Sequence, residues 1–242
     1  MDTIKNRLQA VKSRLAAALA AAGRDQRELV LVAVSKTQPA AAIREAFGEG
    51  LRDFGENYVQ EALPKIAALA DLGIVWHFIG PLQSNKTRAI AEHFDWVHSI
   101  DRLHIAERLS AQRPAGRPPL QVCVQVNVSG EASKSGCAPE EAPALARAVA
   151  VLPGLALRGL MAVPEPTADH GLQRRRFETL RALRDRIASG GAALDTLSMG
   201  MSADLEEAIA AGSTLVRIGT AIFGERGGRK AAASAPANGE HP

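Results

Sequence analysis

The sequence is poor in the residues that mark several protein classes. It has two cysteines, Cys123 and Cys137, without CxxC spacing or a histidine at metal-ligand distance, so we expect reduced thiols, a cytoplasmic protein and no metal site. Aromatic residues form 4% of the chain, with Tyr58 as the single tyrosine, which leaves few platforms on which nucleic-acid bases could stack. No run of about 18 apolar residues occurs, so we expect no membrane span.

Glycine-rich nucleotide motifs are also missing. No Gly-x-x-x-x-Gly-Lys-Ser/Thr loop occurs, which excludes a P-loop nucleotidase. No Gly-x-Gly-x-x-Gly follows the first apolar run, where a dinucleotide-binding sheet carries its phosphate turn. The net charge of +3 falls to +1 when segment 226–242 is set aside. The body of the chain therefore has no basic footprint for nucleic acid.

The chain begins with an apolar stripe that repeats every three or four residues, which is typical of an amphipathic helix. Its members are Ile4, Leu8, Val11, Leu15 and Leu19. Because Lys12 and Arg14 interrupt the alanine-rich stretch, we expect a helix over 1–22 rather than a signal peptide.

Short apolar runs then alternate with helical patterns, and continuous runs are typical of parallel strands buried on both faces. We expect strands at 29–35, 51–55, 74–80, 96–100, 120–128, 155–163, 194–199 and 214–218. Each run except the last is followed by a stretch that can form a helix, such as 40–48, 60–72, 140–152, 172–188 and 203–211.

Eight such units favour a single (β/α)8 TIM barrel, with a doubly wound open sheet as the competing architecture. The predicted barrel domain covers 1–225, including the N-terminal helix. Segment 226–242 is rich in Gly, Ala, Ser and Pro without periodicity, so we expect it to be disordered.

The carboxyl end of the first strand carries a lysine. Lys36 shares the parity of Val30, Val32 and Val34, so we expect its side chain to point into the mouth of the barrel, where active sites of this fold lie. An amine partly removed from water is a competent nucleophile toward carbonyl groups. A lysine that ends a strand can also extend to solvent, and this residue alone leaves both readings open.

Other polar residues end the neighbouring strands. Glu56 and Asn57 follow the second strand, and serines and glycines follow the seventh and eighth. We assign a phosphate to Ser198–Gly200, which includes Met199, and to Gly219–Thr220, because barrels commonly bind phosphate after these strands. Ser202 is expected to cap the next helix. The same glycines and serines could instead serve only tight turns.

A lysine opposite a phosphate site suggests a phosphorylated aldehyde or ketone, either pyridoxal phosphate or a sugar phosphate of the class I aldolase type. Arg217 favours pyridoxal phosphate. A guanidinium beside a pyridine nitrogen donates a hydrogen bond and leaves that nitrogen unprotonated.

Several long motifs, in the same order, resemble those of the pyridoxal 5'-phosphate homeostasis protein family. They are WHFIGPLQSNK at 76–86, AVSKT at 33–37, FGENYVQE at 54–61, SKSG at 133–136, SMGMS at 198–202 and VRIGTAIFG at 216–224.

The resemblance implies a monomeric barrel of fold type III, like the N-terminal domain of alanine racemase, with the cofactor held as a Schiff base on Lys36. It places Asn57 near the ring, Arg217 at the pyridine nitrogen, and Ser198, Gly200, Gly219 and Thr220 around the phosphate. It also implies a carrier or regulator of the cofactor that affects amino-acid and 2-oxo-acid metabolism, with pyridoxal-phosphate-dependent apo-enzymes as partners.

The alternative is a pyridoxal-phosphate-dependent amino-acid racemase, which needs a second base on the far face of the cofactor. We expect the barrel to occupy the chain and to leave no second domain that supplies one, and we expect Tyr58 to pack on the first turn of a helix. His77, His98 and His104 are expected to bond into the barrel wall, although His77 could approach the ring. A plain interaction scaffold would leave Lys36 unexplained. We therefore expect a cofactor-binding protein without catalytic turnover.

Overall fold

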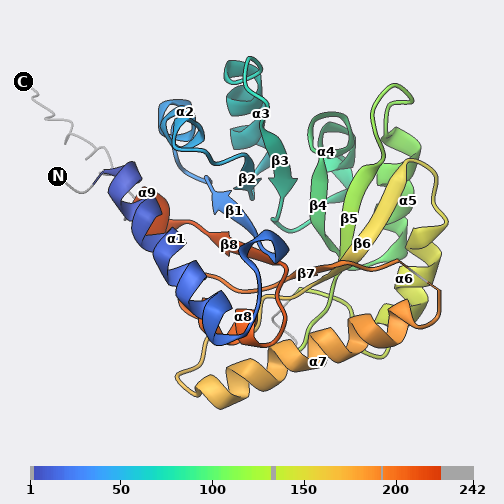
Figure 1. Ribbon diagram of the computed structural model, residues 1–242. Coiled ribbons are helices and arrows are strands. Elements are labelled where there is room, and N and C mark those ends of the chain that lie inside the picture. The colour runs from blue at the N-terminus through green and yellow to red at the C-terminus, as the bar shows by residue number, and fades with distance from the viewer. Residues whose placement is uncertain (1–2, 132–134, 192, 225–242) are drawn as a thin grey trace, which may run out of the picture.

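The chain folds into a closed parallel barrel, in which β1 pairs with both β2 and β8 (Figure 1). This computed structural model describes residues 3–131, 135–191 and 193–224. The expected (β/α)8 barrel is confirmed, because strand and helix alternate around the closed sheet. The strands are β1 (Val30–Val34), β2 (Asp53–Glu56), β3 (Val75–Phe78), β4 (Trp96–Ile100), β5 (Leu120–Gln125), β6 (Leu155–Met161), β7 (Thr196–Ser198) and β8 (Leu215–Ile218).

Helices surround this barrel and connect its strands. The α-helices are α1 (Ile4–Ala21), α2 (Ala40–Gly48), α3 (Val59–Ala68), α4 (Thr87–His93), α5 (Leu103–Gln112), α6 (Ala142–Ala150), α7 (His170–Ala188), α8 (Leu205–Ala210) and α9 (Thr220–Phe223), with short 3₁₀ turns η1 (Gln26–Glu28) and η2 (Ser84–Lys86). Helix α9 follows the last strand, where the sequence pattern predicted none. The expectations for 226–242 and for positions 133 and 134 lie outside the described residues.

Several strands are shorter than the apolar runs that predicted them. β3 ends at Phe78 rather than at 80, β5 ends at Gln125 rather than at 128, and β7 begins at Thr196 rather than at 194. Leu194 and Val126, which lie just beyond their strands, are nevertheless buried. An apolar run therefore overestimates strand length, because the residues entering and leaving a barrel strand stay under the surrounding helices.

The first helix, α1, packs on the outside of the barrel against α8 and α9, its last two helices. The Oγ1 atom of Thr3 caps α1 by accepting the Asn6 N–H at 3.2 Å, and the predicted apolar stripe is buried. Arg7 donates from Nε to the Ile222 carbonyl at 2.8 Å, so α1 is tied to α9, which runs beside it in Figure 1. The predicted N-terminal helix is confirmed, and its apolar stripe packs in the same core cluster as barrel residues.

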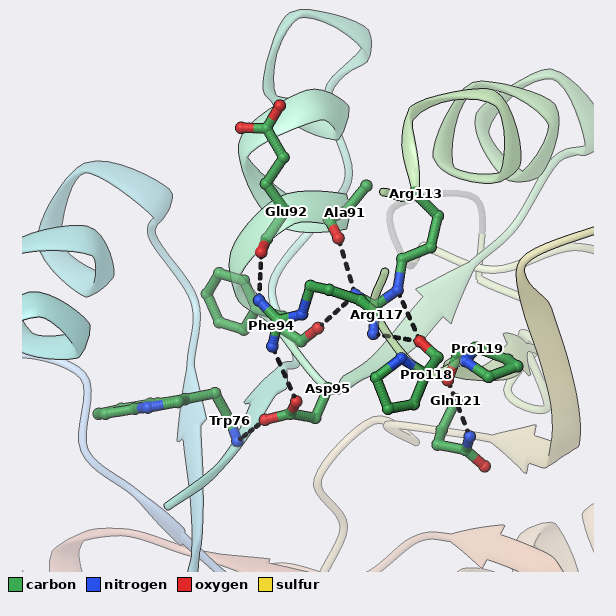
Figure 2. Close-up of polar contacts among 10 residues, drawn as sticks. All are labelled: Trp76, Ala91, Glu92, Phe94, Asp95, Arg113, Arg117, Pro118, Pro119 and Gln121. Carbon is green, nitrogen blue, oxygen red and sulfur yellow. Dashed lines mark hydrogen bonds and ion pairs between the residues drawn. The ribbon is translucent and has the colours of Figure 1, made fainter. Parts of the chain in front are cut away.

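The connection between α5 and β5 braces the amino-terminal ends of three strands. Figure 2 shows Arg113 donating to the Phe94 carbonyl at 2.8 Å, while Asp95 accepts the Trp76 N–H at 2.9 Å and pairs with Arg117 at 3.3 Å. These contacts join the starts of β3, β4 and β5. They hold the barrel end that lies opposite Lys36.

Both cysteines are free, as the sequence indicated, and the structure buries both of them. Burial raises the pKa of the Cys123 thiol to about 12 and that of Cys137 to about 11, which disfavours the reactive thiolate. Within the described ranges, no helix is both long enough and apolar enough to cross a membrane.

Candidate functional site

The structure brings Lys36 together with the loop that follows β8. Lys36, Gly219 and Thr220 line one small cavity of about 30 Å³ with Val34. A Cβ atom added to Gly219 would lie 3.1 Å from the Val34 carbonyl oxygen and 3.3 Å from its Cβ, so the two strand ends approach closely. The predicted lysine and half of the predicted phosphate segment therefore share the carboxyl-terminal mouth of the barrel.

A buried ion cluster holds the turn that carries Lys36. The Lys65 ammonium on α3 donates to the Ser35 carbonyl at 2.9 Å and contacts the Glu56 and Glu61 carboxylates at 2.8 and 2.6 Å. The Glu61 carboxylate also accepts the N–H of Thr37, which has a φ of 67°. Left-handed backbone at a threonine needs support from its surroundings, and this cluster provides it.

Glu56 belongs to that cluster and not to the mouth of the barrel. Its side chain is fully buried and accepts the Ser35 hydroxyl at 2.6 Å. Burial raises its pKa, while hydrogen bonds from Lys65 and Ser35 act in the opposite direction. The carboxylate that the sequence offered to the mouth therefore faces α3, because alternate residues of β2 point to opposite sides of the sheet.

Asn57, the amide that follows β2, carries a buried acceptor atom at the carboxyl-terminal end of that strand. Its Oδ1 atom is inaccessible to solvent and has no hydrogen-bond partner among the described residues. A buried polar atom of this kind is costly unless a ligand or water satisfies it. Its backbone is held against Gly80, where an added Cβ would lie 2.2 Å from the Asn57 carbonyl oxygen.

This close approach gives a stability prediction. The substitution Gly80→Ala is expected to lower the free energy of unfolding by about 1–3 kcal/mol, because the new methyl group meets backbone that cannot rotate away. Gly73→Ala is the matched control, since no atom lies within 4 Å of its added Cβ. Urea denaturation measures both variants. Equal transition midpoints for the two would contradict the proposed clash.

The interior end of the site contains Arg217 and Ser198. Arg217 is 4% exposed and donates from Nη2 to the Ala162 carbonyl at 2.9 Å and from Nη1 to the Ser198 hydroxyl. Burial lowers its pKa to about 10, against the opposing influence of Asp204 and Cys123. The guanidinium therefore remains a cation at neutral pH in a place largely removed from water.

The loop after β7 departs from the expected phosphate segment in its side chains. Ser198 is fully buried, and its hydroxyl bonds inside the barrel to Arg217 and to His98 Nδ1, the latter at 2.7 Å. Met199 packs in the apolar cluster under α7 and α8. Gly200 has a φ of 97°, and an added Cβ would meet Ala208 at 2.6 Å. Only the backbone of this segment remains to face a ligand.

The predicted cap of the following helix was wrong. Helix α8 begins at Leu205 with Asp204 in the N-cap position, and the Asp204 Oδ1 atom accepts the Met201 N–H at 2.6 Å. Ser202 therefore precedes the helix. Asp204 also accepts a hydrogen bond from Gln173 on α7 at 2.8 Å, which fixes this carboxylate between two helices.

The histidines of β3 and β4 lie in the barrel wall, as expected. His77 and His98 are buried, with 2.9 Å between Nδ1 of the first and Nε2 of the second. His77 Nε2 lies 3.0 Å from Asp53 Oδ1. The same expectation was wrong for His104, which is exposed on α5 and lies outside this interior group because its helix covers the outside of the barrel. A continuous row of polar side chains thus crosses the interior from Arg217 to Asp53.

Comparison with known proteins identifies the family. Residues 6–227 match the family model described as the N-terminal domain of alanine racemase. The pyridoxal phosphate homeostasis protein of Pseudomonas aeruginosa is 66% identical over 226 residues, which cover 93% of this chain and 97% of that protein. The chain belongs to the pyridoxal phosphate homeostasis protein family. The Escherichia coli K12 member is 54% identical over 234 residues, covering 93% of this chain and 98% of that protein.

Solved structures support the same family. PipY of Synechococcus elongatus, solved with PLP bound, has 37% identity and a TM-score of 0.79, covering 92% of this chain and 100% of that chain. An alanine racemase of Clostridium difficile has 13% identity and a TM-score of 0.73, covering 95% of this chain and 58% of that one. The racemase likeness concerns the fold alone. The resemblance of the motifs to the homeostasis family is therefore confirmed.

Sequence reasoning missed two groups of residues that support this family site. One is the Glu56–Lys65–Glu61 cluster, for which the four-residue spacing of Glu61 and Lys65 on α3 was an available signal. The other is the connection of Asp53 to Arg217 through the histidines. Strand parity could have placed these side chains inside, but their order depends on how far neighbouring strands are offset.

Proposed function

We propose that this protein binds pyridoxal phosphate through the Lys36 amine and serves intracellular homeostasis of that cofactor as a carrier or regulator. The observation that carries the proposal is the shared cavity of Lys36, Gly219 and Thr220. The unpartnered Oδ1 atom of Asn57 supports it, because a bound ring would bring polar atoms to that acceptor. PipY, a structural neighbour at 37% identity, binds PLP.

The residues of the site fit the separate parts of this cofactor. When bound, pyridoxal phosphate would supply an aldehyde carbon, conjugated to an electron-withdrawing ring, to which the Lys36 amine could bond. Arg217 would donate a hydrogen bond to the ring nitrogen and, as a lasting cation, would keep that nitrogen unprotonated. Gly200, Gly219 and Thr220 would hold the phosphate. Ser198 and Met199 contribute their backbone, since their side chains are engaged elsewhere.

A carrier role is favoured over a racemase because the proposed site, built from the described residues, includes no second base opposite Lys36. Tyr58, the single tyrosine, occupies the N-cap position of α3 and is 54% exposed, rather than packed on the helix as expected. An exposed phenol at that place does not form a base opposite Lys36. We propose a cytoplasmic monomer that passes its cofactor to pyridoxal-phosphate-dependent apo-enzymes and turns over no substrate.

The first test concerns attachment. The full chain is loaded with pyridoxal phosphate, reduced with borohydride and digested, and the peptides are mapped by mass spectrometry. The expected result is one pyridoxyl group, located on Lys36. A label on another lysine, or none at all, would reject the proposed site.

The second test separates a carrier from a racemase. The loaded protein is incubated with L-alanine in deuterated water and, in a second vessel, with an apo-enzyme that requires pyridoxal phosphate. We expect the apo-enzyme to gain activity and the alanine to gain neither deuterium at Cα nor the D-configuration. Sustained deuteration with accumulation of D-alanine would instead establish a racemase.

A further inference from the structure

We propose that Asp53, His77 and His98 are positioning residues that orient Ser198 and Arg217 through one directed hydrogen-bond chain across the barrel. This hydrogen-bond chain links the cofactor end of the barrel to a separate cavity at the amino-terminal end of the barrel. Its effect on the cofactor rests on the proposed function above. Its existence and direction are properties of the protein alone.

The contacts form an unbroken series. Arg217 Nη1 donates to Ser198 Oγ, which lies 2.7 Å from His98 Nδ1. His98 Nε2 lies 2.9 Å from His77 Nδ1, and His77 Nε2 lies 3.0 Å from Asp53 Oδ1. The four participating strands are β8, β7, β4 and β3, with Asp53 at the start of β2. Side chains from non-neighbouring strands therefore meet in the centre of the barrel.

The carboxylate at one end determines the direction of every bond. Ionised Asp53 can only accept, so His77 carries its proton on Nε2 and uses Nδ1 as an acceptor. His98 must then donate from Nε2, and its Nδ1 accepts the Ser198 hydroxyl proton. The Ser198 oxygen is left as an acceptor for Arg217. Both imidazoles are consequently neutral Nε2–H tautomers.

The opposite arrangement is unfavourable. If His77 were an imidazolium, His98 would donate from Nδ1 to Ser198 and the serine proton would have no acceptor in the chain. A second buried cation would also lie near Arg217. Burial, together with His77 and Arg217, lowers the pKa of His98 well below its ordinary value, in agreement with a neutral ring.

The far end of the chain opens into a cavity of about 400 Å³ at the starts of the strands. Asp53, with its side chain 27% exposed, lines this cavity. The His77 ring stacks on Trp96 at a centroid distance of 5.5 Å and an interplanar angle of 12°, which keeps its nitrogens aimed at Asp53 and His98. The other charged residues of the cavity are Arg27, Glu28, Arg158 and Asp195.

The hydrogen-bond chain explains why this barrel has polar side chains in its interior. Branched apolar side chains normally fill this space, whereas here polar groups cross it. A buried polar network is favourable only when every member is satisfied, and the single direction of these bonds satisfies each of them. Without the Asp53 acceptor, neither His77 nor His98 would be restricted to the Nε2–H tautomer. The Ser198 hydroxyl could then turn its proton away from His98. Arg217 would lose its fixed partner.

Nitrogen NMR of the histidine rings in the full chain without cofactor tests the direction. We expect both rings as neutral Nε2–H tautomers in the native protein. A proton on Nδ1 of either ring would overturn the proposal without any variant. Because no cofactor is present, this result is independent of whether Lys36 binds pyridoxal phosphate.

Variants test the dependence on Asp53. Asp53→Leu removes the acceptor, and we expect a mixture of tautomers at His77 and His98 and a shift of the Arg217 side-chain N–H signals. Asp53→Asn keeps a carbonyl oxygen and should restore the native pattern. Asp195→Asn is the matched control, because Asp195 lines the same cavity but pairs with Arg158. The proposed dependence on Asp53 would be overturned if the histidine and Arg217 signals of Asp53→Leu matched those of the native protein. It would also be overturned if Asp195→Asn changed these signals equally.

The loaded protein gives the second readout. In Asp53→Leu we expect the nitrogen resonance of the bound cofactor ring to shift, with Lys36 still labelled by borohydride, whereas Asp195→Asn and Asp53→Asn should leave it in place. An unchanged ring resonance in Asp53→Leu would refute the link to the cofactor. Failure of the native protein to label Lys36 would refute the proposed function instead.

Discussion

The substitution Lys65→Met is expected to lower the free energy of unfolding by about 3–5 kcal/mol at neutral pH, because it leaves Glu56 as an uncompensated buried charge. The Lys65 ammonium contacts Glu56 at 2.8 Å and Glu61 at 2.6 Å, and the Glu56 side chain is 0% exposed. Methionine fills a similar volume, so packing changes little. Urea denaturation followed by circular dichroism measures the loss.

The double variant Glu56→Gln/Lys65→Met provides the control. A neutral amide replaces the stranded carboxylate, so we expect the double variant to be more stable than Lys65→Met alone. If both variants were equally destabilised, the loss would come from packing around position 65 and the charge argument would be wrong.

The pH dependence of this loss follows from the direction of the Glu56 shift. Burial raises the pKa of Glu56 in the folded protein above its ordinary value, so the folded state binds more protons than the unfolded state between the two values. Stability therefore falls as the pH rises through that window. Removing Lys65 raises this pKa further. The deficit of Lys65→Met should accordingly shrink in acid, which denaturation at pH values on both sides of the window measures.

The same cluster illustrates which parts of the site are legible in a sequence. Lys36 was predicted at the mouth from local information, because two-residue periodicity along a single strand determines its side. The role of Lys65 was not, since it depends on α3 folding back over the turn after β1. That packing brings together residues 30 positions apart. A sequence pattern describes each helix or strand separately and does not show how one element packs against another.

The hydrogen-bond chain inside the barrel shows a second limit of prediction from the sequence. Parity along the strands places His77, His98, Ser198 and Arg217 inside, and the burial of the histidines was predicted. Their sequence of contacts was not, because it depends on the stagger between strands, including the register shift of β4 against β5. The eight-unit architecture could be predicted because it repeats. The bond of the Ser198 hydroxyl to Arg217 was consequently not predicted.

The substitution Lys36→Ala is expected to abolish covalent capture of pyridoxal phosphate completely. The amine is the single group of the proposed site that can bond to the cofactor carbonyl, whereas Gly200, Gly219, Thr220 and Arg217 act through hydrogen bonds and charge. Borohydride reduction should therefore label no peptide of the variant, and the yellow colour of the loaded protein should be absent.

Two further measurements make the Lys36→Ala result specific. Lys86→Ala removes another half-buried lysine, which ends the η2 turn after β3 at the same end of the barrel, and this variant should label as the native protein does. Equilibrium dialysis of Lys36→Ala should detect weaker, reversible binding, because the residues proposed for the phosphate and the ring nitrogen remain. Full labelling of Lys36→Ala, or loss of labelling in Lys86→Ala, would contradict the assignment of the amine.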